Sequence, residues 1–242
     1  MKNNINRLFV ESQLEIDASI MLLAQSHYLM NVMRKKIGDK VKVFNGKDGE
    51  WLGEITYYSK KLGVEIRLKE CLRQQEKLPE LWLIFAPIKQ SRLHFILEKA
   101  TELGVTKIFP VLTARTIMPN INLDKSKLIM AEAAEQSNRL DVPVIYNIQK
   151  LEELLSNWHH NNKIILCNET EVNINISNVT CKLEQYIYTI LVGPEGGFTL
   201  QELNYLSRMP FIYSVKLGTQ ILRSETAAIS ALAYIQMTRI IT

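Results

Sequence analysis

Two glycine-bearing segments contain the residues whose types and spacing suit a ligand site. The first is LVGPEGGFT, residues 191–199, which follows an apolar run typical of a buried strand and precedes a helix pattern. Thr199 and Glu202 form a T-x-x-E pattern that predicts a capping box at the start of that helix. Glycines at the carboxyl end of a strand let a ligand approach the backbone. A tight strand-to-helix turn with no ligand is the alternative interpretation.

The second segment is VKLGTQILRSETAA, residues 215–228. A strand pattern ends at Gly218, and Ser224 is a candidate N-cap for the final helix. Between them, Ile221 and Leu222 are suited to wall an adenine pocket, because ligand sites are mostly apolar with a few placed polar groups. A lone arginine before a helix is more often a surface residue than a catalytic one, so Arg223 keeps both interpretations here.

Several common catalytic patterns are absent from the sequence. It has no G-x-x-x-x-G-K-[ST] phosphate loop, no G-x-G-x-x-G and no G-x-S-x-G nucleophile elbow. The segment HFILE, residues 94–98, is not H-E-x-x-H, and the pair His159-His160 lies in a polar loop pattern. The sequence therefore predicts no metal site.

The elements that position the two glycine segments alternate in type. An apolar run at 81–88 predicts a buried parallel strand, and a helix pattern follows at 91–103, with Ser91 as its N-cap and Gly104 as its stop. A strand at 107–112 and an amphipathic helix at 125–140 come next, and alternation continues to the C-terminal helix. Such alternation predicts an α/β domain with a parallel sheet. Residues 169–180 are Asn-rich and predict a loop.

The N-terminal third has a different pattern. Residues 41–58 are rich in β-branched and aromatic residues, broken by the turn signals Asn45-Gly46 and Asp48-Gly49, and 63–68 predict another strand. Residues 27–36 predict a short helix with a basic end. Closely spaced short strands favour a small β-barrel. Since 73–80 is a polar linker pattern, we expect two domains, 1–73 and 74–242.

Charge and cysteine usage bound the partners and the compartment. Residues 1–73 carry 13 Lys and Arg against 9 Asp and Glu, whereas the rest of the chain is balanced at 16 against 16. The excess of positive charge in residues 1–73 indicates that this part binds a polyanion. The alternative is that it is a solvated basic surface with no such partner. The three cysteines, Cys71, Cys167 and Cys181, form no C-x-x-C pair, which predicts neither a disulfide framework nor zinc. Without a signal-peptide or membrane-span pattern, we expect a cytoplasmic protein.

The two glycine segments together resemble the SPOUT superfamily of methyltransferases, and more narrowly the RsmE family, which methylates N3 of a uridine in 16S ribosomal RNA. The resemblance runs along nearly the whole chain. Arg7-Leu8-Phe9-Val10 is similar to the family's R-x-F start, and residues 27–34 to its H-x-x-x-V-L-R element, with Met33 in place of Leu. Residues 99–111 and 132–143 resemble its two middle motifs, with Asn138 in place of Gly.

The resemblance implies a PUA-like RNA-binding β-barrel followed by an α/β domain with a trefoil knot. It also implies a homodimer and S-adenosylmethionine as cofactor, with small-subunit ribosomal RNA, free or in an assembled subunit, as substrate. Carried over by position, the cofactor-binding residues are Glu169, Val192, Gly193, Pro194, Glu195, Gly196, Gly197, Leu217, Gly218, Ile221, Leu222, Thr226 and Ala227. For Glu195, capping of backbone groups within the turn is the alternative.

The reaction assigns roles to a few further residues. Arg223 is the first catalytic candidate, because a cation favours the N3 anion of uracil. Arg139 is the second candidate for acting on the uridine. Glu225 is a further catalytic candidate, with pairing to Arg223 as the alternative. Arg7, Arg34 and Arg139 are the candidate RNA-binding residues. Three other functions stay open: another SPOUT activity on transfer RNA, at a base or a ribose; a non-catalytic RNA-binding protein; and a small-molecule α/β enzyme.

Overall fold

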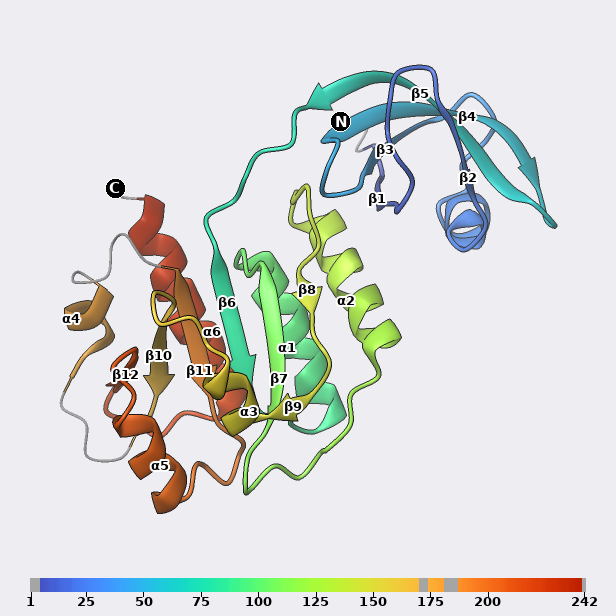
Figure 1. Ribbon diagram of the computed structural model, residues 1–242. Coiled ribbons are helices and arrows are strands. Elements are labelled where there is room, and N and C mark those ends of the chain that lie inside the picture. Colours follow the sequence, from blue (N-terminus) through green and yellow to red (C-terminus); the bar gives the residue numbers. More distant parts are fainter. Residues whose placement is uncertain (1–4, 170–173, 181–186, 241–242) are drawn as a thin grey trace. The chain divides into compact units, whose positions relative to one another are not determined.

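The computed structural model describes residues 5–169, 174–180 and 187–240 (Figure 1). They form two compact units: unit 1 is Met1–Lys77 with Ala134–Val142, and unit 2 is Leu78–Ala133 with Pro143–Thr242. The prediction of contiguous domains at 1–73 and 74–242 did not anticipate the segment from the middle of the chain that joins unit 1. Cys181 and residues 170–173 of the predicted loop lie outside the described residues.

Unit 1 contains a five-stranded sheet. Its strands are β1 (Arg7–Phe9), β2 (Ser19–Leu22), β3 (Lys40–Phe44), β4 (Glu50–Ser59) and β5 (Gly63–Arg73), in the order β1-β3-β4-β5-β2. Only the β1–β3 pair is parallel. The sheet buries an aliphatic cluster that includes Val41, Val43, Ile55, Ile66 and Leu68. The predicted N-terminal strands are therefore confirmed, and β5 runs five residues further than the predicted 63–68.

The turn between β3 and β4 contains the predicted glycine signals. Gly46 and Gly49 have φ of +78° and +85°, a region that favours glycine. A Cβ on Gly49 would lie 2.1 Å from the carbonyl oxygen of Arg73, so no side chain fits there. The side chain of Asn45 accepts a hydrogen bond from the backbone N–H of Asp48 at 2.8 Å, which closes the turn locally.

The short helix predicted at 27–36 is smaller and of another type. The structure has a π-helix, η1 (Tyr28–Val32). The backbone N–H of Met33 donates to the carbonyl of Tyr28, five residues back. Arg34 then adopts φ +53°, a left-handed conformation that no helix continues through. The basic end of the predicted helix is thus an irregular segment.

Helix α2 (Leu123–Gln136) ends before Leu140, the predicted last residue. Asn138 has φ +65°, and Asn is one of the few non-glycine residues that adopt this conformation readily. The Arg7 guanidinium donates to the carbonyls of Ala134 and Glu135 in the last turn of α2, at 3.0 and 2.8 Å, and to that of Arg139 just beyond it, at 2.5 Å. These bonds join the end of the helix to β1, and both belong to unit 1.

Unit 2 is an α/β unit with a parallel sheet, as predicted. Its strands are β6 (Leu81–Phe85), β7 (Lys107–Leu112), β8 (Val144–Ile145), β9 (Gln149–Lys150), β10 (Lys163–Cys167), β11 (Tyr188–Val192) and β12 (Ile212–Val215). The main path is β12-β10-β11-β6-β7-β8, with β9 paired to β7, and every pair is parallel. The central strands β6 and β11 are buried along their whole length, as their continuous apolar sequences require.

Helices cover the sheet of unit 2 (Figure 1). Helices α1 (Gln90–Glu102) and α6 (Ser224–Ile240) pack on each other, and α6 also packs on β10 and β11. Helices α3 (Leu151–Ser156) and α5 (Leu200–Ser207) contribute to an apolar cluster with side chains of β6, β7, β10 and β11.

Two local predictions in unit 2 were wrong. The N-cap of α1 is Lys89, with no side-chain capping bond, so Ser91 lies inside the helix and does not cap it. Helix α4 (Ile176–Thr180) lies within the segment predicted as a loop. Both errors concern ends and short elements, where local sequence signals are weakest.

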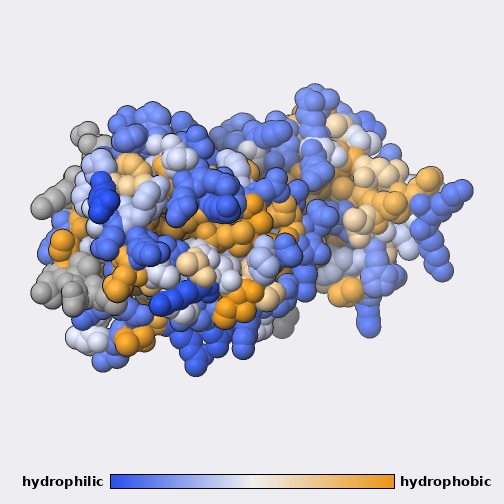
Figure 2. Space-filling view, turned by 60° about the horizontal axis from the view of Figure 1, so that its bottom comes forward, coloured by the Kyte–Doolittle hydropathy of each residue, from blue (hydrophilic) through white to orange (hydrophobic). Residues whose placement is uncertain are grey.

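Some large apolar side chains remain exposed, among them Ile16, Leu23, Val32, Ile117 and Leu200. On the face in Figure 2, hydrophilic residues predominate and hydrophobic residues form small groups among them. No helix within the described ranges has the length and apolarity needed to cross a bilayer. The long apolar runs in the sequence are accounted for by buried strands and by α6.

Candidate active site

The parallel register of unit 2 brings the carboxyl ends of its central strands to one edge of the sheet. Cys167 of β10 pairs with Val192 of β11 and with Val215 of β12, and Val192 pairs with Phe85 of β6. The loops after these strands surround a cavity of about 460 Å³. This is the edge at which ligands bind in open α/β sheets.

The turn after β11 forms one wall of the cavity. The backbone N–H of Gly197 donates to the carbonyl of Pro194 at 2.9 Å, and Gly197 has φ +66°. A Cβ on Gly193 would lie 2.8 Å from the ring of Phe198, closer than real Cβ contacts. The turn therefore depends on glycine for two separate reasons, a left-handed backbone and close packing of an aromatic ring.

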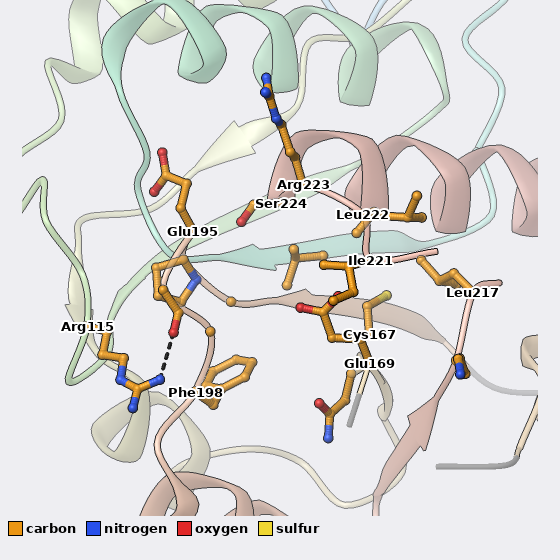
Figure 3. Close-up of a pocket in the computed structure, with 18 of the residues that line it drawn as sticks. Arg115, Cys167, Glu169, Glu195, Phe198, Leu217, Ile221, Leu222, Arg223 and Ser224 are labelled. Carbon is orange, nitrogen blue, oxygen red and sulfur yellow. Dashed lines mark hydrogen bonds between the residues drawn. The ribbon is translucent and has the colours of Figure 1, made fainter. Parts of the chain in front are cut away.

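The predicted capping box holds the far end of this turn. The side chain of Thr199 accepts from the backbone N–H of Glu202, and the Glu202 carboxylate accepts from the backbone N–H of Thr199 at 2.7 Å. The guanidinium of Arg115, from the loop after β7, donates to the carbonyl of Gly196 at 2.8 Å (Figure 3). The turn is thus fixed both from α5 and from a neighbouring loop.

An apolar wall lies across from the glycine turn. Figure 3 places Leu217, Ile221 and Leu222, from the segment between β12 and α6, around the cavity with Cys167. The side chain of Ile221 is exposed, at 81% of its surface. Burial raises the pKa of the Cys167 thiol to about 12.

The charged side chains that line the cavity are Arg92, Arg115, Glu169, Glu195, Lys216 and Arg223. Arg223 lines the cavity just before α6, and in Figure 3 its side chain points away from Leu217 and Cys167. Glu225 is 9% exposed and does not line the cavity. Its Oε1 lies 3.5 Å from Nε of Arg92, whose Nη1 is also 3.5 Å from Glu195. The pairing of Glu225 with Arg223, which the sequence left open, is replaced by pairing with Arg92.

Most of the residues carried over by resemblance meet at this cavity. Twelve of the thirteen candidate cofactor residues line it, and Thr226 is the exception, because it is exposed on α6. Their role in binding stays a prediction. The sequence reasoning missed other lining residues, among them Arg92, Arg115, Asn168, Phe198 and Lys216. Phe198 and Lys216 lie inside the two glycine segments, and Arg115 and Asn168 follow the carboxyl ends of β7 and β10.

The three candidate RNA-binding arginines differ in surroundings. Arg34 is exposed. The Arg7 guanidinium lies 2.5 Å from Glu50, and its side chain is 10% exposed. Arg139 is 8% exposed and binds both carboxylate oxygens of Asp141 at 3.1 Å. Burial lowers the pKa of Arg139, and the Asp141 charge opposes that shift. The side chains of Arg7 and Arg139 are thus held by contacts within unit 1, whereas the side chain of Arg34 is exposed.

No cluster of three or more His, Cys, Asp or Glu suited to a metal ion occurs among the residues that the structure describes. The cavity instead combines an apolar wall, a glycine turn and a few charged groups. This composition is typical of a site for an organic molecule of moderate size.

Comparisons with known proteins agree with this arrangement. Residues 74–236 match the model of an RNA methyltransferase domain, and residues 24–66 match an RNA methyltransferase PUA domain. The chain is 37% identical over 235 residues to ribosomal RNA small subunit methyltransferase E of Rickettsia conorii, covering 96% of this chain and 95% of the relative. It is 29% identical over 247 residues to the protein of that name from Buchnera aphidicola, covering 98% of each.

A solved structure extends the likeness to three dimensions. Ribosomal RNA small subunit methyltransferase E of Neisseria gonorrhoeae, bound to S-adenosylmethionine, superposes with a TM-score of 0.87 at 26% identity, covering 97% of this chain and 98% of that one. Both units of the present chain thus have counterparts in one solved enzyme. The chain belongs to the family of the ribosomal RNA small subunit methyltransferase E enzymes, the family that its two glycine segments resemble.

Proposed function

We propose that the protein transfers a methyl group from S-adenosylmethionine to N3 of a uridine in small-subunit ribosomal RNA. The observation that carries the proposal is the cavity at the carboxyl edge of the sheet, walled by the glycine turn and by the segment 217–223. Family membership supplies the reaction class. A trefoil knot, which the resemblance implies for unit 2, stays a prediction.

The residues around the cavity fit S-adenosylmethionine. Apolar surface for an adenine ring is offered by Leu217, Ile221 and Leu222. The side chain of Ile221 is exposed, so a bound adenine ring could pack against it. Glycines at 193 and 196–197 allow close approach to backbone groups. Asn168 and Glu169 supply polar groups suited to ribose hydroxyls. The volume of about 460 Å³ lies in the range of sites for molecules of this size.

The bound cofactor supplies a methyl group on a sulfonium, which becomes a neutral thioether when the new N–C bond forms. This chain must bring the uracil N3 into line with that methyl group, and such positioning accounts for much of the rate of a displacement. N3 carries a proton on the Watson–Crick edge, so the base has to be unpaired or flipped out. We assign to Arg223 the role of favouring the N3 anion by charge, with the N3 proton leaving to solvent.

Unit 1 supplies a basic surface for the RNA. The exposed Arg34 lies in a segment that also holds Lys35, Lys36 and Lys40, with Asp39 as its one acidic residue. Clustered cations on a surface bind phosphates and release counterions. We therefore assign phosphate docking to this segment, and Arg34 keeps the role predicted for it. Arg7 and Arg139 act by shaping unit 1.

We also propose that the protein acts as a homodimer. The support for the homodimer is the family resemblance. Light scattering on purified protein should give twice the 27.9 kDa of one chain. A mass of one chain at micromolar concentration would overturn the dimer.

The experiment that tests the reaction is methylation of purified small ribosomal subunits with labelled S-adenosylmethionine, followed by nucleoside analysis. We expect label in 3-methyluridine. Arg223→Ala should remove turnover and keep S-adenosylmethionine binding within a few-fold, since the arginine acts on the base. Label in another nucleoside would support methyltransferase activity and contradict the assignment to N3 of uridine. Normal turnover by Arg223→Ala would overturn the role of Arg223.

A further inference from the structure

Arg115 is an exposed cation whose position is nevertheless fixed. It lies in the loop after β7, and its Nη1 donates to the carbonyl of Gly196 at 2.8 Å (Figure 3). Its aliphatic stem packs along the same glycine, because a Cβ on Gly196 would lie 3.5 Å from both Cβ and Cδ of Arg115. An exposed long side chain ordinarily keeps its rotamer freedom, so two contacts with one residue of the glycine turn indicate a set orientation.

The loop that carries Arg115 is itself fixed on both sides of the arginine. The backbone N–H of Ala114 donates to the carboxylate of Glu202 at 2.8 Å. The backbone N–H of Thr113 donates to Oγ1 of Thr116 at 2.8 Å, and the backbone N–H of Thr116 donates to the carbonyl of Thr113 at 3.1 Å. A loop ordered in this way before any ligand binds spares the ligand the cost of ordering it.

The charge of Arg115 is oriented but not neutralised. A carbonyl accepts its hydrogen bond, and Arg115 forms no ion pair with a carboxylate within residues 5–169, 174–180 and 187–240. Among the described residues, cations outnumber carboxylates around the cavity, since four arginine and lysine side chains line it against those of Glu169 and Glu195. Glu195 is in turn 3.5 Å from Arg92. The rim of the cavity therefore carries an excess of positive charge, which attracts an anion.

We propose that Arg115 binds a phosphate of the ribosomal RNA beside the uridine whose base enters the cavity. The inference rests on the proposed function, in which that base leaves its stack to reach the cofactor. A nucleotide with its base inserted keeps its sugar and phosphates at the rim, where an exposed guanidinium meets them. The Gly196 carbonyl uses a single N–H group of Arg115, so the rest of the planar fork remains for a bidentate bond to phosphate.

The carboxylate of S-adenosylmethionine is the other anion that the site would receive, and two observations favour RNA. The cofactor carries a sulfonium and an ammonium against a single carboxylate, so it is itself a cation, and the excess positive charge of the rim suits a polyanion better. Arg115 is also exposed, whereas a small ligand is largely enclosed by its site.

Arg115→Gln and Arg115→Lys separate the charge of the side chain from its contacts with the turn. Glutamine keeps part of the stem and an N–H donor for the Gly196 carbonyl but loses the charge, whereas lysine keeps the charge and loses the fork. Arg208→Gln is the matched control, because Arg208 follows α5 in the same unit, is exposed and does not line the cavity. It removes the same charge outside the rim.

The first measurement is the salt dependence of binding to small-subunit ribosomal RNA. The slope of log affinity against log salt counts the phosphates that the protein neutralises, at about 0.7 per contact on a single strand. Arg115→Gln should therefore lose about 0.7 of the wild-type slope, while Arg115→Lys and Arg208→Gln should keep it. A side chain that only supported the turn would leave the slope unchanged. A wild-type slope in Arg115→Gln, or an equal loss in Arg208→Gln, would overturn the proposal.

The second measurement is the affinity for S-adenosylmethionine, by calorimetry. We expect Arg115→Gln to stay within about three-fold of the wild type, since the capping box and the bond between Gly197 and Pro194 still hold the turn. A loss of cofactor affinity of about ten-fold together with a wild-type salt slope would assign Arg115 to the cofactor's carboxylate and overturn the RNA contact.

Methylation kinetics on small ribosomal subunits give a third readout. In Arg115→Gln, KM for the subunits should rise several-fold and kcat should stay nearly unchanged, because a phosphate contact is present both before and during methyl transfer. A fall in kcat with an unchanged KM would contradict a docking role. Failure of the wild type to form 3-methyluridine would count against the proposed function alone, because the salt slope is measured without turnover.

Discussion

The backbone N–H of Ala114 donates a hydrogen bond to Oε1 of Glu202 at 2.8 Å, although the two residues are 88 positions apart. The other oxygen of that carboxylate completes the capping box with Thr199. One side chain thus ties the loop after β7 to the start of α5, at the end of the glycine turn. The local capping pattern and the long-range contact use the two oxygens of the same carboxylate.

Glu202→Ala should weaken both the helix start and the cavity wall. Loss of a cap costs about 0.5–2 kcal/mol, so we expect the free energy of unfolding to fall by about 1–2 kcal/mol. The affinity for S-adenosylmethionine, measured by calorimetry, should fall several-fold, because the turn loses its anchor. Glu202→Gln keeps one acceptor oxygen, so its stability and its affinity for S-adenosylmethionine should lie between those of the wild type and Glu202→Ala. The exposed Gln201→Ala is the control, and equal binding by it and Glu202→Ala would contradict the argument.

Gly193→Ala should damage the cavity by a different route. The new methyl group would lie 2.8 Å from the Phe198 ring, which packs against the core cluster, so the ring and the turn must shift. Overpacking of this kind costs about 1–3 kcal/mol, and S-adenosylmethionine affinity should fall about ten-fold. A Cβ on Gly218 meets nothing within 4 Å, so Gly218→Ala is the control for stability and should change it by less than about 0.5 kcal/mol. Wild-type affinity in Gly193→Ala would show that the turn does not contact the cofactor.

The carboxylate of Glu50 should make the stability of unit 1 depend on pH. Burial raises the pKa of Glu50, but hydrogen bonds from Arg73 and Arg7 outweigh burial and leave it below the ordinary value of about 4.3. A lowered pKa stabilises the folded state above the unfolded-state pKa, and that stabilisation is lost as the pH falls through the folded-state value.

Denaturant unfolding at several pH values measures this effect. Glu50→Gln should be less stable than the wild type by about 2–4 kcal/mol at pH 7, because it leaves Arg7 and Arg73 without their carboxylate. The stability difference between the wild type and Glu50→Gln should shrink below about pH 4.3, and it should nearly vanish once Glu50 is protonated in the folded protein as well. Glu54→Gln, which removes an exposed carboxylate 3.9 Å from Lys69, should change stability little at any pH. A pH-independent difference for Glu50→Gln would refute the assignment.

The arginines predicted to bind RNA should separate by experiment into two kinds. Arg34→Ala should lower the salt slope of RNA binding by about 0.7–0.9 and leave the melting temperature nearly unchanged, since its side chain is exposed. Arg139→Ala should lower the melting temperature, because it leaves Asp141 without its bidentate partner, and should keep the slope of the folded protein. If Arg139→Ala lowered the salt slope and Arg34→Ala did not, Arg139 would be an RNA contact and Arg34 would not.

Asn138 stands at a position where only the structure explains why asparagine is accepted. The resemblance predicts glycine at this position, and the sequence alone gives no reason why asparagine is accepted. The structure gives φ +65° there and shows Arg73 donating to both the carbonyl and the side-chain oxygen of Asn138. Asparagine tolerates the left-handed backbone that glycine would adopt, and its side chain adds a bond that glycine lacks.

What the sequence determined by itself is what depends on near neighbours along the chain. The capping box of Thr199 and Glu202, the glycine turns and the alternation of buried strands with helices could all be predicted, because each arises within a few residues. The tertiary structure alone decided which partners distant charges take. Arg7 meets carbonyls more than 120 residues away, and Arg92 bridges Glu195 and Glu225. No local pattern encodes such contacts, because they exist only once folding has brought separate segments together.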